Sequence, residues 1–375
     1  MDTSKQMRLV LFLTRGTSLK DWEKTGLLSR ELAIYKRLQN AGVAITLVTY
    51  GKRSDLDLSS QIPEAKIICN RWSLPQSWYI RFLPILVWLA VGKEWIGKSN
   101  QILGADIGLS VAHNVDQKFI VRGGYVFSLN SERAHGVDSQ EANYARTLEA
   151  AVFAKADKIV VTTESSAKEI RKRYSLPTSK IVVIPNYVDT DVFRRIPVEK
   201  GENIRIGYIG RLVEAKNPLA LLDAISGLSV SLYMVGGGPL RATLRQKAQE
   251  QGSEVIFAGY IPNSQLPQIL NQCDLFVLPS LYEGHPKSLL EAMACALPVI
   301  ATDVPGNREL IRHEVDGILC GTSAAEIRKA ILRLRENKTL RTQLGENARR
   351  HVVEEFSLDR VAKMEMELLR EMSVS

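Results

Sequence analysis

Cysteine and histidine are scarce in this chain of 375 residues, and neither occurs in a spacing typical of a metal site. The four cysteines are Cys69, Cys273, Cys295 and Cys320, and no two of them form a CxxC pair. Three lie in apolar runs typical of a core, so buried, reduced thiols and a cytoplasmic location are predicted. The five histidines are scattered, and the sequence predicts neither a bound metal nor another cofactor.

The sequence predicts no targeting segment and no membrane-spanning segment. No charged stretch precedes an apolar run at the start of the chain, so no secretory signal is expected. The apolar stretch 77–95 is interrupted and shorter than the roughly 20 apolar residues that cross a bilayer. Two interpretations of it stay open: a helix buried against a sheet, or a helix on the membrane surface with Trp78, Tyr79, Trp88 and Trp95 near the headgroups.

The net charge of +8 is unevenly distributed. Residues 1–195 contain 28 Lys and Arg against 19 Asp and Glu, whereas residues 196–375 contain 21 against 22. Either this is chance over many exposed faces, or a basic surface in the first half meets an anionic partner such as a membrane surface or a lipid-linked phosphate. Nucleic acid is not expected, because no aromatic and basic RNA motif or recognition helix is present.

Short β-rich apolar runs alternate with helical patterns along the whole chain. The predicted strands are 8–14, 44–50, 66–70, 106–111, 119–124, 158–163, 180–186, 204–210, 230–236, 254–260, 274–280, 297–302 and 317–320. Helical patterns such as 25–41, 140–156 and 164–174 lie between them. Apolar strands alternating with helices predict an α/β protein with two parallel sheets, each covered on both faces, as in two Rossmann-like domains.

The polar stretch 187–202 lacks sustained periodicity and is predicted to hold the domain boundary. The predicted domains are 1–190 and 191–355, followed by a C-terminal helix at 356–375. In parallel sheets, ligands collect where strands end, so the loops after the strands of the second half are expected to meet at one edge.

Several side chains in these loops suit a phosphorylated ligand. Arg211 and Lys216 follow a strand directly and could neutralise a diphosphate. The glycine turn 236–238 allows close backbone approach. It is not the full GxGxxG pattern, which argues against a nicotinamide cofactor.

The stretch EGHPKSLLEA, residues 283–292, places two glutamates around the start of a predicted helix. Pro286 suits the first turn, and the unpaired N–H groups that follow it would seat an anion or sugar hydroxyls. Glu283 lies just before this seat and Glu291 about 7 Å along the axis. The two could therefore grip different parts of one elongated ligand, and they do not resemble the carboxylate pair of a glycosidase.

From about residue 140 to 357 the chain resembles the retaining GT-B glycosyltransferases of family 4, the bacterial group 1 glycosyltransferases. The motifs that carry the resemblance are IGYIGRLVEAKN, MVGGGPL, FAGYIPNSQL and DLFVLPSLYEGHPKSLLEAMACALPVIATDVPGNRELI. The resemblance implies two Rossmann-like domains facing each other across a cleft, an acceptor-binding N-terminal domain and a donor-binding C-terminal domain. It also implies that the last helix crosses back to the N-terminal domain.

The resemblance implies roles for individual residues in metal-independent transfer of a hexose. Arg211 and Lys216 would hold the donor diphosphate, Glu283 would contact the donor sugar as a catalytic group, and Glu291 would bind the ribose. Further donor contacts are implied for Gly210, Gly236, Gly237, Gly238, Tyr260, Ile261, Gly284, His285, Lys287, Ser288 and Leu289.

The first half departs from the family pattern. The loop TRGTSLKDWEKTG contains only Gly16 and Gly26 where the family has a glycine-rich turn, and Arg122 follows the strand where the family commonly has a histidine. The candidate acceptor-side or cleft-side residues are Arg122, Gly123, His113 and Asn186.

The function expected from these features is retaining transfer of a sugar from a UDP- or GDP-linked donor to a hydroxyl group of a glycan or lipid-linked acceptor. Cell-surface polysaccharide biosynthesis by a cytoplasmic or peripheral membrane enzyme fits this chemistry. Two alternatives share the fold: a sugar-nucleotide epimerase and a non-catalytic binder of nucleotide sugars.

Overall fold

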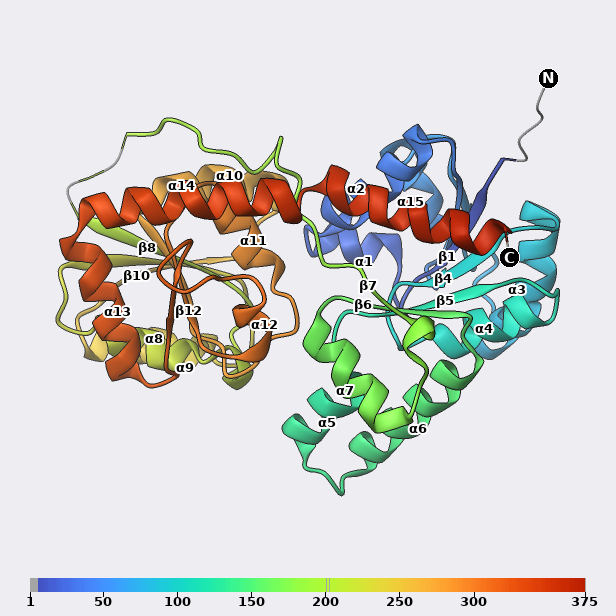
Figure 1. Cartoon of the computed structure of the whole chain (residues 1–375), viewed down its shortest axis with the longest axis horizontal. Helices are drawn as coiled ribbons and strands as arrows, with labels where there is room; N and C mark the ends of the chain where they lie inside the picture. Colours follow the sequence, from blue (N-terminus) through green and yellow to red (C-terminus); the bar gives the residue numbers. More distant parts are fainter. Residues whose placement is uncertain (1–5, 200, 202, 375) are drawn as a thin grey trace. The chain divides into compact units, whose positions relative to one another are not determined.

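A computed structural model describes the chain except for residues 1–5, 200, 202 and 375, and it contains two compact units (Figure 1). The first unit comprises Met1–Pro185 together with Val361–Ser375, and the second unit is Asn186–Arg360. The first division falls at 185 and 186, where the sequence analysis put 190 and 191. The second division falls within the last helix, α15 (Leu358–Val374).

The first unit is built on a seven-stranded parallel sheet with the order β3-β2-β1-β4-β5-β6-β7. Its strands are β1 (Arg8–Phe12), β2 (Ala44–Val48), β3 (Lys66–Ile68), β4 (Ile96–Ser99), β5 (Phe119–Gly123), β6 (Lys158–Val161) and β7 (Ile181–Val183). The direction of the strand order reverses between β1 and β4. Ligands of such sheets bind at this switch point, outside the carboxyl ends of the strands.

Helices cover both faces of this sheet. The helices of this unit before α15 are α1 (Leu19–Lys24), α2 (Leu28–Asn40), α3 (Gln76–Val91), α4 (Ala105–His113), α5 (Phe127–His135), α6 (Gln140–Lys155) and α7 (Glu164–Tyr174), with the 3-10 helices η1 (Arg53–Gln61) and η2 (Thr178–Lys180). Helices α3, α4, α6 and α7 share one core on one face, and α1, α2 and α15 lie on the other face (Figure 1).

One predicted strand of the first half is wrong. Residues 106–111 lie within α4, and the strand at this place in the sheet is β4. The apolar pattern of β4 is broken by Lys98, which is buried and pairs with Glu365 of α15 at 2.5 Å. Burial lowers the pKa of Lys98, and the neighbouring Glu365 carboxylate opposes that shift. The pair attaches the last helix to the sheet of the first unit.

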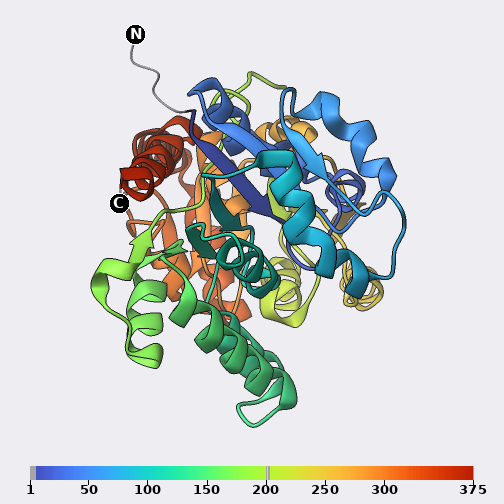
Figure 2. The ribbon, with the colours of Figure 1, turned by 90° about the vertical axis from the view of Figure 1, so that its right-hand side faces the viewer.

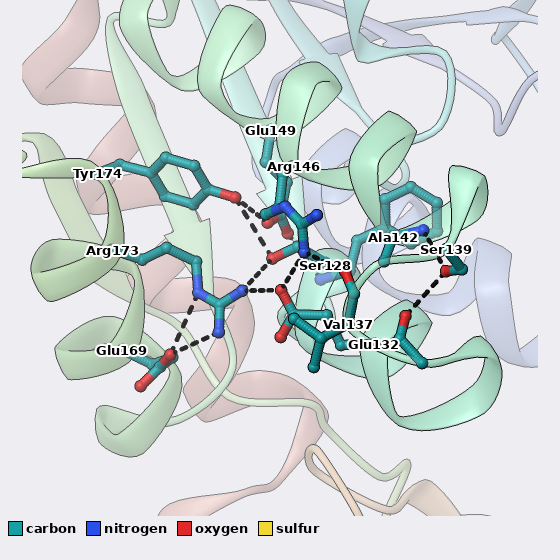
Figure 3. A network of polar contacts seen from close by, with 12 residues as sticks. Ser128, Glu132, Val137, Ser139, Ala142, Arg146, Glu149, Glu169, Arg173 and Tyr174 are labelled. Atoms are coloured by element: carbon teal, nitrogen blue, oxygen red, sulfur yellow. Dashed lines mark hydrogen bonds and ion pairs between the residues drawn. The ribbon is translucent and has the colours of Figure 1, made fainter.

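A polar network joins α5, α6 and α7 (Figure 3). Glu149 is buried in this network and accepts hydrogen bonds from the Phe127 backbone N–H and the Tyr174 hydroxyl, both at 2.6 Å. Glu132 accepts from Arg173 at 2.6 Å. Because Phe127 begins α5, the network also fixes the end of the loop that follows β5.

The second unit is built on a six-stranded parallel sheet with the order β10-β9-β8-β11-β12-β13. Its strands are β8 (Ile204–Ile209), β9 (Val230–Val235), β10 (Glu254–Gly259), β11 (Leu275–Leu278), β12 (Val299–Thr302) and β13 (Ile318–Cys320), close to the six predicted. Its helices are α8 (Pro218–Ile225), α9 (Arg241–Glu250), α10 (Leu266–Gln272), α11 (Lys287–Ala294), α12 (Pro305–Arg308), α13 (Ala324–Glu336) and α14 (Lys338–Glu355), with η3 (Glu214–Lys216) and η4 (Asn263–Gln265). Its switch point lies between β8 and β11.

Two cores cover the faces of this second sheet. Along β11, Leu275 and Val277 pack into one core, and Phe276 and Leu278 pack into the other. This alternation follows from the two-residue period of a strand. Helices α8, α9 and α13 lie on one face and α10, α11 and α14 on the other (Figure 1). The strand therefore reads as continuously apolar in the sequence, as parallel strands covered on both faces do.

The cysteines are free thiols, as the sequence analysis predicted. Cys69, Cys273 and Cys295 are buried and Cys320 is half-buried. Burial raises the pKa of the Cys69 thiol to about 11 and the pKa values of the Cys295 and Cys320 thiols to about 12. These groups therefore stay protonated at neutral pH, which makes them poor nucleophiles.

Candidate functional site

Five loops of the second unit meet at the carboxyl edge of its sheet, and we call them the rim: 210–217, 236–240, 260–265, 280–286 and 303–306. Hydrogen bonds join neighbouring loops or the strand ends beside them. These bonds run from Gly236 N to Gly259 O at 2.7 Å, from Leu212 N to Gly237 O at 2.8 Å, from Leu281 N to Ala215 O at 2.9 Å and from the Thr302 hydroxyl to Ser280 O at 2.5 Å. The predicted convergence of these loops is therefore present.

The rim glycines let the loops approach one another. A Cβ atom at Gly236 would overlap the carbonyl oxygen of Gly210, and one at Gly238 would overlap the backbone of Leu212. Both glycines also have positive φ angles, of 128° and 154°. The glycine turn after β9 therefore has a structural reason in the loop beside it, in addition to the ligand approach that the sequence predicted.

A lysine and a glutamate from the two loops at the switch point form an ion pair. Lys216 Nζ donates to Glu283 Oε1 at 2.5 Å, and the Ser280 hydroxyl donates to the same oxygen at 2.6 Å. The Glu283 side chain is 6% exposed and that of Lys216 is 23% exposed. Arg211 lies exposed on the same loop as Lys216, and its carbonyl accepts from the buried Tyr208 hydroxyl at 3.0 Å. Two of the predicted cations and one predicted carboxylate thus lie where the sheet order reverses.

The helix start beside this pair differs slightly from the predicted one. Helix α11 begins at Lys287, so Pro286 is the N-cap residue rather than part of the first turn, and its side chain makes no capping hydrogen bond. Lys287 and Ser288 are half-buried, whereas Leu289 is buried in the core. The first N–H groups of a helix point out of its start, so this end of α11 faces the rim. Gly284 packs so closely on Gly306 that a Cβ on the latter would overlap its carbonyl oxygen.

Asn186 and His285 support the loop 280–286 through buried contacts. Asn186 is buried in the second unit, and its Nδ2 donates to the carbonyl oxygen of His285 at 2.7 Å. The buried His285 ring packs edge-on against Phe356, with ring centroids 5.3 Å apart. The structure therefore places Asn186 behind the loop 280–286, and its predicted role on the acceptor or cleft side stays a prediction.

Glu291 lies toward the other side of the rim. Its side chain is 2% exposed, and Oε1 accepts from the Asn263 amide at 2.8 Å, in the loop after β10. Tyr260 in the same loop is 67% exposed and its ring lies against Gly237, while Ile261 is half-buried. The two glutamates of EGHPKSLLEA therefore contact different loops of one edge.

The switch point of the first unit carries a second ion pair, which the sequence analysis missed. Arg15 follows β1, Asp106 lies in the first turn of α4 after β4, and their side chains form a short ion pair. Gly104 lets the backbones of the two loops approach, because a Cβ there would lie 2.9 Å from the backbone nitrogen of Arg15. Among the described residues, the Tyr50 hydroxyl and Asp106 Oδ1 are buried polar atoms without a hydrogen-bond partner. Polar ligand groups would satisfy both atoms.

The acceptor-side or cleft-side candidates in the first unit lie in different places. Arg122 and Gly123 end β5, and the Arg122 backbone N–H donates to Ser99 Oγ at 3.0 Å, so both lie at the carboxyl edge. His113 is exposed at the last residue of α4, which leads back to the start of β5. The structure therefore places His113 away from the edge that holds Arg122.

No group of three or more His, Cys, Asp or Glu side chains in the described part of the chain could hold a metal ion. The metal-independent reaction implied by the resemblance stays a prediction.

A doubly covered parallel sheet with cations and carboxylates at its switch point defines the second unit as a Rossmann-like domain suited to nucleotide ligands. Two known families match consecutive parts of this chain and support its assignment to the group 1 glycosyltransferases of family 4. The family described as "Glycosyl transferases group 1" matches residues 189–351, and the family described as "Glycosyltransferase Family 4" matches residues 110–192.

Relatives and solved structures agree with this assignment. A glycosyltransferase of Methanocaldococcus jannaschii, itself uncharacterized, is 26% identical over an alignment of 375 positions. The alignment covers 91% of this chain and 94% of that protein. The Escherichia coli UDP-Gal:alpha-D-GlcNAc-diphosphoundecaprenol alpha-1,3-galactosyltransferase is 30% identical over 200 residues, 48% of this chain and 51% of its own length. The match with that enzyme thus spans about half of it.

Among solved structures, Anabaena HepE in complex with UDP and glucose is similar with a TM-score of 0.78 at 19% identity, over 97% of this chain and 100% of its own. At this identity the likeness shows the fold alone. The predicted two-domain GT-B fold is confirmed.

Proposed function

We propose that this protein is a retaining glycosyltransferase that moves a sugar from a UDP- or GDP-linked donor to a hydroxyl group of a glycan or lipid-linked acceptor, in cell-surface polysaccharide biosynthesis at the inner face of the membrane. The observation that carries the proposal is the Lys216–Glu283 pair, which lies at the switch point beside the start of α11. The name of the Escherichia coli relative, with its UDP-linked donor and diphosphoundecaprenol acceptor, and the UDP in the HepE complex support it.

The leaving diphosphate would be held by charge and by helix geometry. Arg211 and Lys216 lie on one loop, and the N–H groups at the start of α11 face the same rim. Negative charge grows on the diphosphate as the bond to the sugar breaks, and fixed donors aimed at that charge lower the barrier. Removing one such donor costs roughly 10²–10³ in rate.

Glu283 would hold the donor sugar, and Glu291 the ribose. Ser280 and Lys216 fix the Glu283 carboxylate before the donor arrives, so little ordering is left for the binding step. The Glu291 carboxylate faces the loop after β10, where exposed Tyr260 offers a flat apolar face to a base. The rim thus presents separate groups to the sugar, the diphosphate, the ribose and the base.

A thermal-shift screen of UDP- and GDP-sugars tests the donor. A ligand that binds only the native state at 100 times its dissociation constant stabilises it by about 2.7 kcal/mol, so the correct donor should raise the melting temperature clearly. The variant Lys216→Ala should lose most of this shift. A chain that responds to NAD and to no nucleotide sugar would contradict the proposal.

The stereochemistry and the reaction class need a second measurement. With the donor from the screen and a glycan or lipid-linked acceptor, NMR of the product should show the anomeric configuration of the donor. An inverted product would refute retention alone. Conversion of the donor to another sugar nucleotide without any acceptor would instead identify an epimerase.

A further inference from the structure

Helix α3 exposes a broad apolar face on the first unit. Its buried side is the stripe Tyr79, Leu83 and Val87, and the Tyr79 hydroxyl donates to the carbonyl oxygen of Thr49 at 2.8 Å. The large apolar side chains exposed on or just before the helix are Trp72, Trp78, Phe82, Ile85, Trp88 and Leu89, between 40% and 67% exposed. The helix therefore packs on the sheet through one face and exposes the other, and the membrane-surface interpretation of 77–95 stays a prediction.

The exposed apolar residues form one continuous patch. At 100° per residue, positions 78, 82, 85, 88 and 89 fall within about a third of the helix circumference. The Trp78 and Phe82 rings stack with their centroids 6.2 Å apart. Single exposed apolar residues are ordinary, but a contiguous patch of this kind marks an interaction site. Tyr79 and Trp95, which the membrane interpretation also named, are buried and lie outside it.

The charged residues of the segment that carries the patch are basic. Residues 65–93 contain Lys66, Arg71, Arg81 and Lys93 and no Asp or Glu, and Glu64 and Glu94 flank the segment. Arg71, Arg81 and Lys93 are exposed, and the Arg71 guanidinium lies 4.1 Å from the centre of the Trp72 ring. Tryptophan flanked by cations suits the boundary between lipid headgroups and acyl chains. No helix among the described residues has the length and apolarity to cross a bilayer.

We propose that this face of α3, together with Trp72, docks the first unit on the surface of an anionic lipid bilayer, with the apolar side chains inserted among the acyl chains and the cations at the headgroups. Figure 2 shows α3 on the outside of its unit, lying along the layer of helices. A second copy of the chain fits this face less well, because a two-fold interface would bring the same cations against each other. The inference rests on the lipid-linked acceptor of the proposed function and deepens it. Vesicle binding is measured without donor or acceptor, so the docking proposal and the proposed function can fail independently.

Flotation of the full chain with vesicles tests the proposal. The wild-type protein should float with vesicles of phosphatidylcholine and phosphatidylglycerol (7:3) and bind pure phosphatidylcholine at least tenfold more weakly. The triple variant Trp78→Ser, Trp88→Ser, Leu89→Ser should bind the anionic vesicles at least tenfold more weakly than the wild type. The matched control is Val137→Ser, Ile256→Ser, Val353→Ser, which removes three exposed apolar side chains elsewhere and should bind normally.

Quenching by brominated lipids shows whether the patch enters the bilayer. Wild-type tryptophan fluorescence should fall on binding, whereas a variant with Trp72, Trp78 and Trp88 changed to Phe should bind but lose the quenching. Trp22 and Trp95, which that variant retains, are buried. Equal vesicle binding by the patch variant (Trp78→Ser, Trp88→Ser, Leu89→Ser) and by its matched control would overturn the proposal. So would a wild-type dimer that ignores vesicles and that the patch variant converts to a monomer, because a second copy would then cover this face.

Discussion

The two units share one architecture, and each carries a cation–carboxylate pair at its switch point. In the second unit Lys216 and Glu283 are 23% and 6% exposed, whereas in the first unit Arg15 and Asp106 are 36% and 37% exposed. Beside the exposed pair, the Tyr50 hydroxyl is buried without a hydrogen-bond partner among the described residues. One fold thus supports a closely packed charged site and a more open one.

This difference fits the two kinds of ligand that a glycosyltransferase handles. The diphosphate is the same in UDP- and GDP-linked donors, so a site for it can be built in advance from fixed groups, which reduces the ordering needed on binding. Acceptors differ from enzyme to enzyme, and an exposed pair with unfilled hydrogen bonds nearby leaves room for that variation. We therefore expect changes at the Lys216–Glu283 pair to act on the chemical step. Changes at the Arg15–Asp106 pair should act on the acceptor.

The largest effect is expected at the closely packed pair. Lys216→Ala and Glu283→Ala should each lower the rate of nucleotide release in the presence of acceptor by roughly 10²–10³. The first variant removes a fixed positive charge beside the leaving diphosphate, and the second removes the carboxylate that holds the donor sugar. The cost in stability should be only about 1.5–3 kcal/mol, the range for a hydrogen bond to a charged group. Steady-state kinetics and thermal unfolding measure the two effects separately.

An ion pair of the same unit that lies away from the rim serves as the control for that result. Lys247 and Asp223 join α9 and α8 at 2.7 Å, with side chains 32% and 38% exposed. Lys247→Ala should cost at most about 1 kcal/mol and leave the rate unchanged. Near-normal rates in both rim variants would remove the basis for the assigned site.

A smaller effect is expected at the open pair of the first unit. Arg15→Ala and Asp106→Asn should each reduce kcat/KM for the acceptor by roughly tenfold, equivalent to about 1.4 kcal/mol. The thermal shift caused by the donor should stay unchanged. Lys20→Ala, which breaks the exposed pair with Glu23 on α1, is the matched control. Equal losses in donor binding and acceptor turnover would mean that the two units do not divide the ligands in this way.

The second unit could be predicted from the sequence because its strands are largely apolar and because charged residues and glycines follow them directly. The strand runs gave the order of the loops along the chain, and the general position of ligands in parallel sheets gave the edge. The orientation of the contacts could not be derived. Asn186 supports the loop through a backbone carbonyl 99 positions away, and such a contact leaves no local pattern.

The first unit was harder to predict for a specific reason. The buried Lys98 of β4 is paired with Glu365, 267 positions away, so the strand lacked an apolar pattern and the helix after it was taken for the strand. With β4 missing, the loop after it was not recognised as part of the switch point. Asp106 was therefore assigned to a strand instead of a site. Because the partner of the buried Lys98 is distant in sequence, β4 was not predicted. The pairing of Arg15 with Asp106, which follows β4, was therefore not predicted either.

The smallest expected effect is a pair of opposite pH dependences in the network of Figure 3. Burial raises the pKa of Glu149, against the hydrogen bonds that it accepts, so the folded state binds more protons and stability falls as pH rises above the ordinary pKa of 4.5. The hydrogen bond from Arg173 lowers the pKa of Glu132, so its contribution is present above 4.5 and is lost as pH falls through the lowered pKa. Glu149→Gln should therefore gain stability relative to wild type as pH rises from 4.5 to 7, by at most about 1.4 kcal/mol per pH unit. Glu132→Gln should have a lower free energy of unfolding than wild type above pH 4.5, and this difference should disappear as pH falls below 4.5. Urea unfolding across this pH range measures both differences, and parallel curves for the two variants would show that burial and ion pairing do not set these pKa values as described.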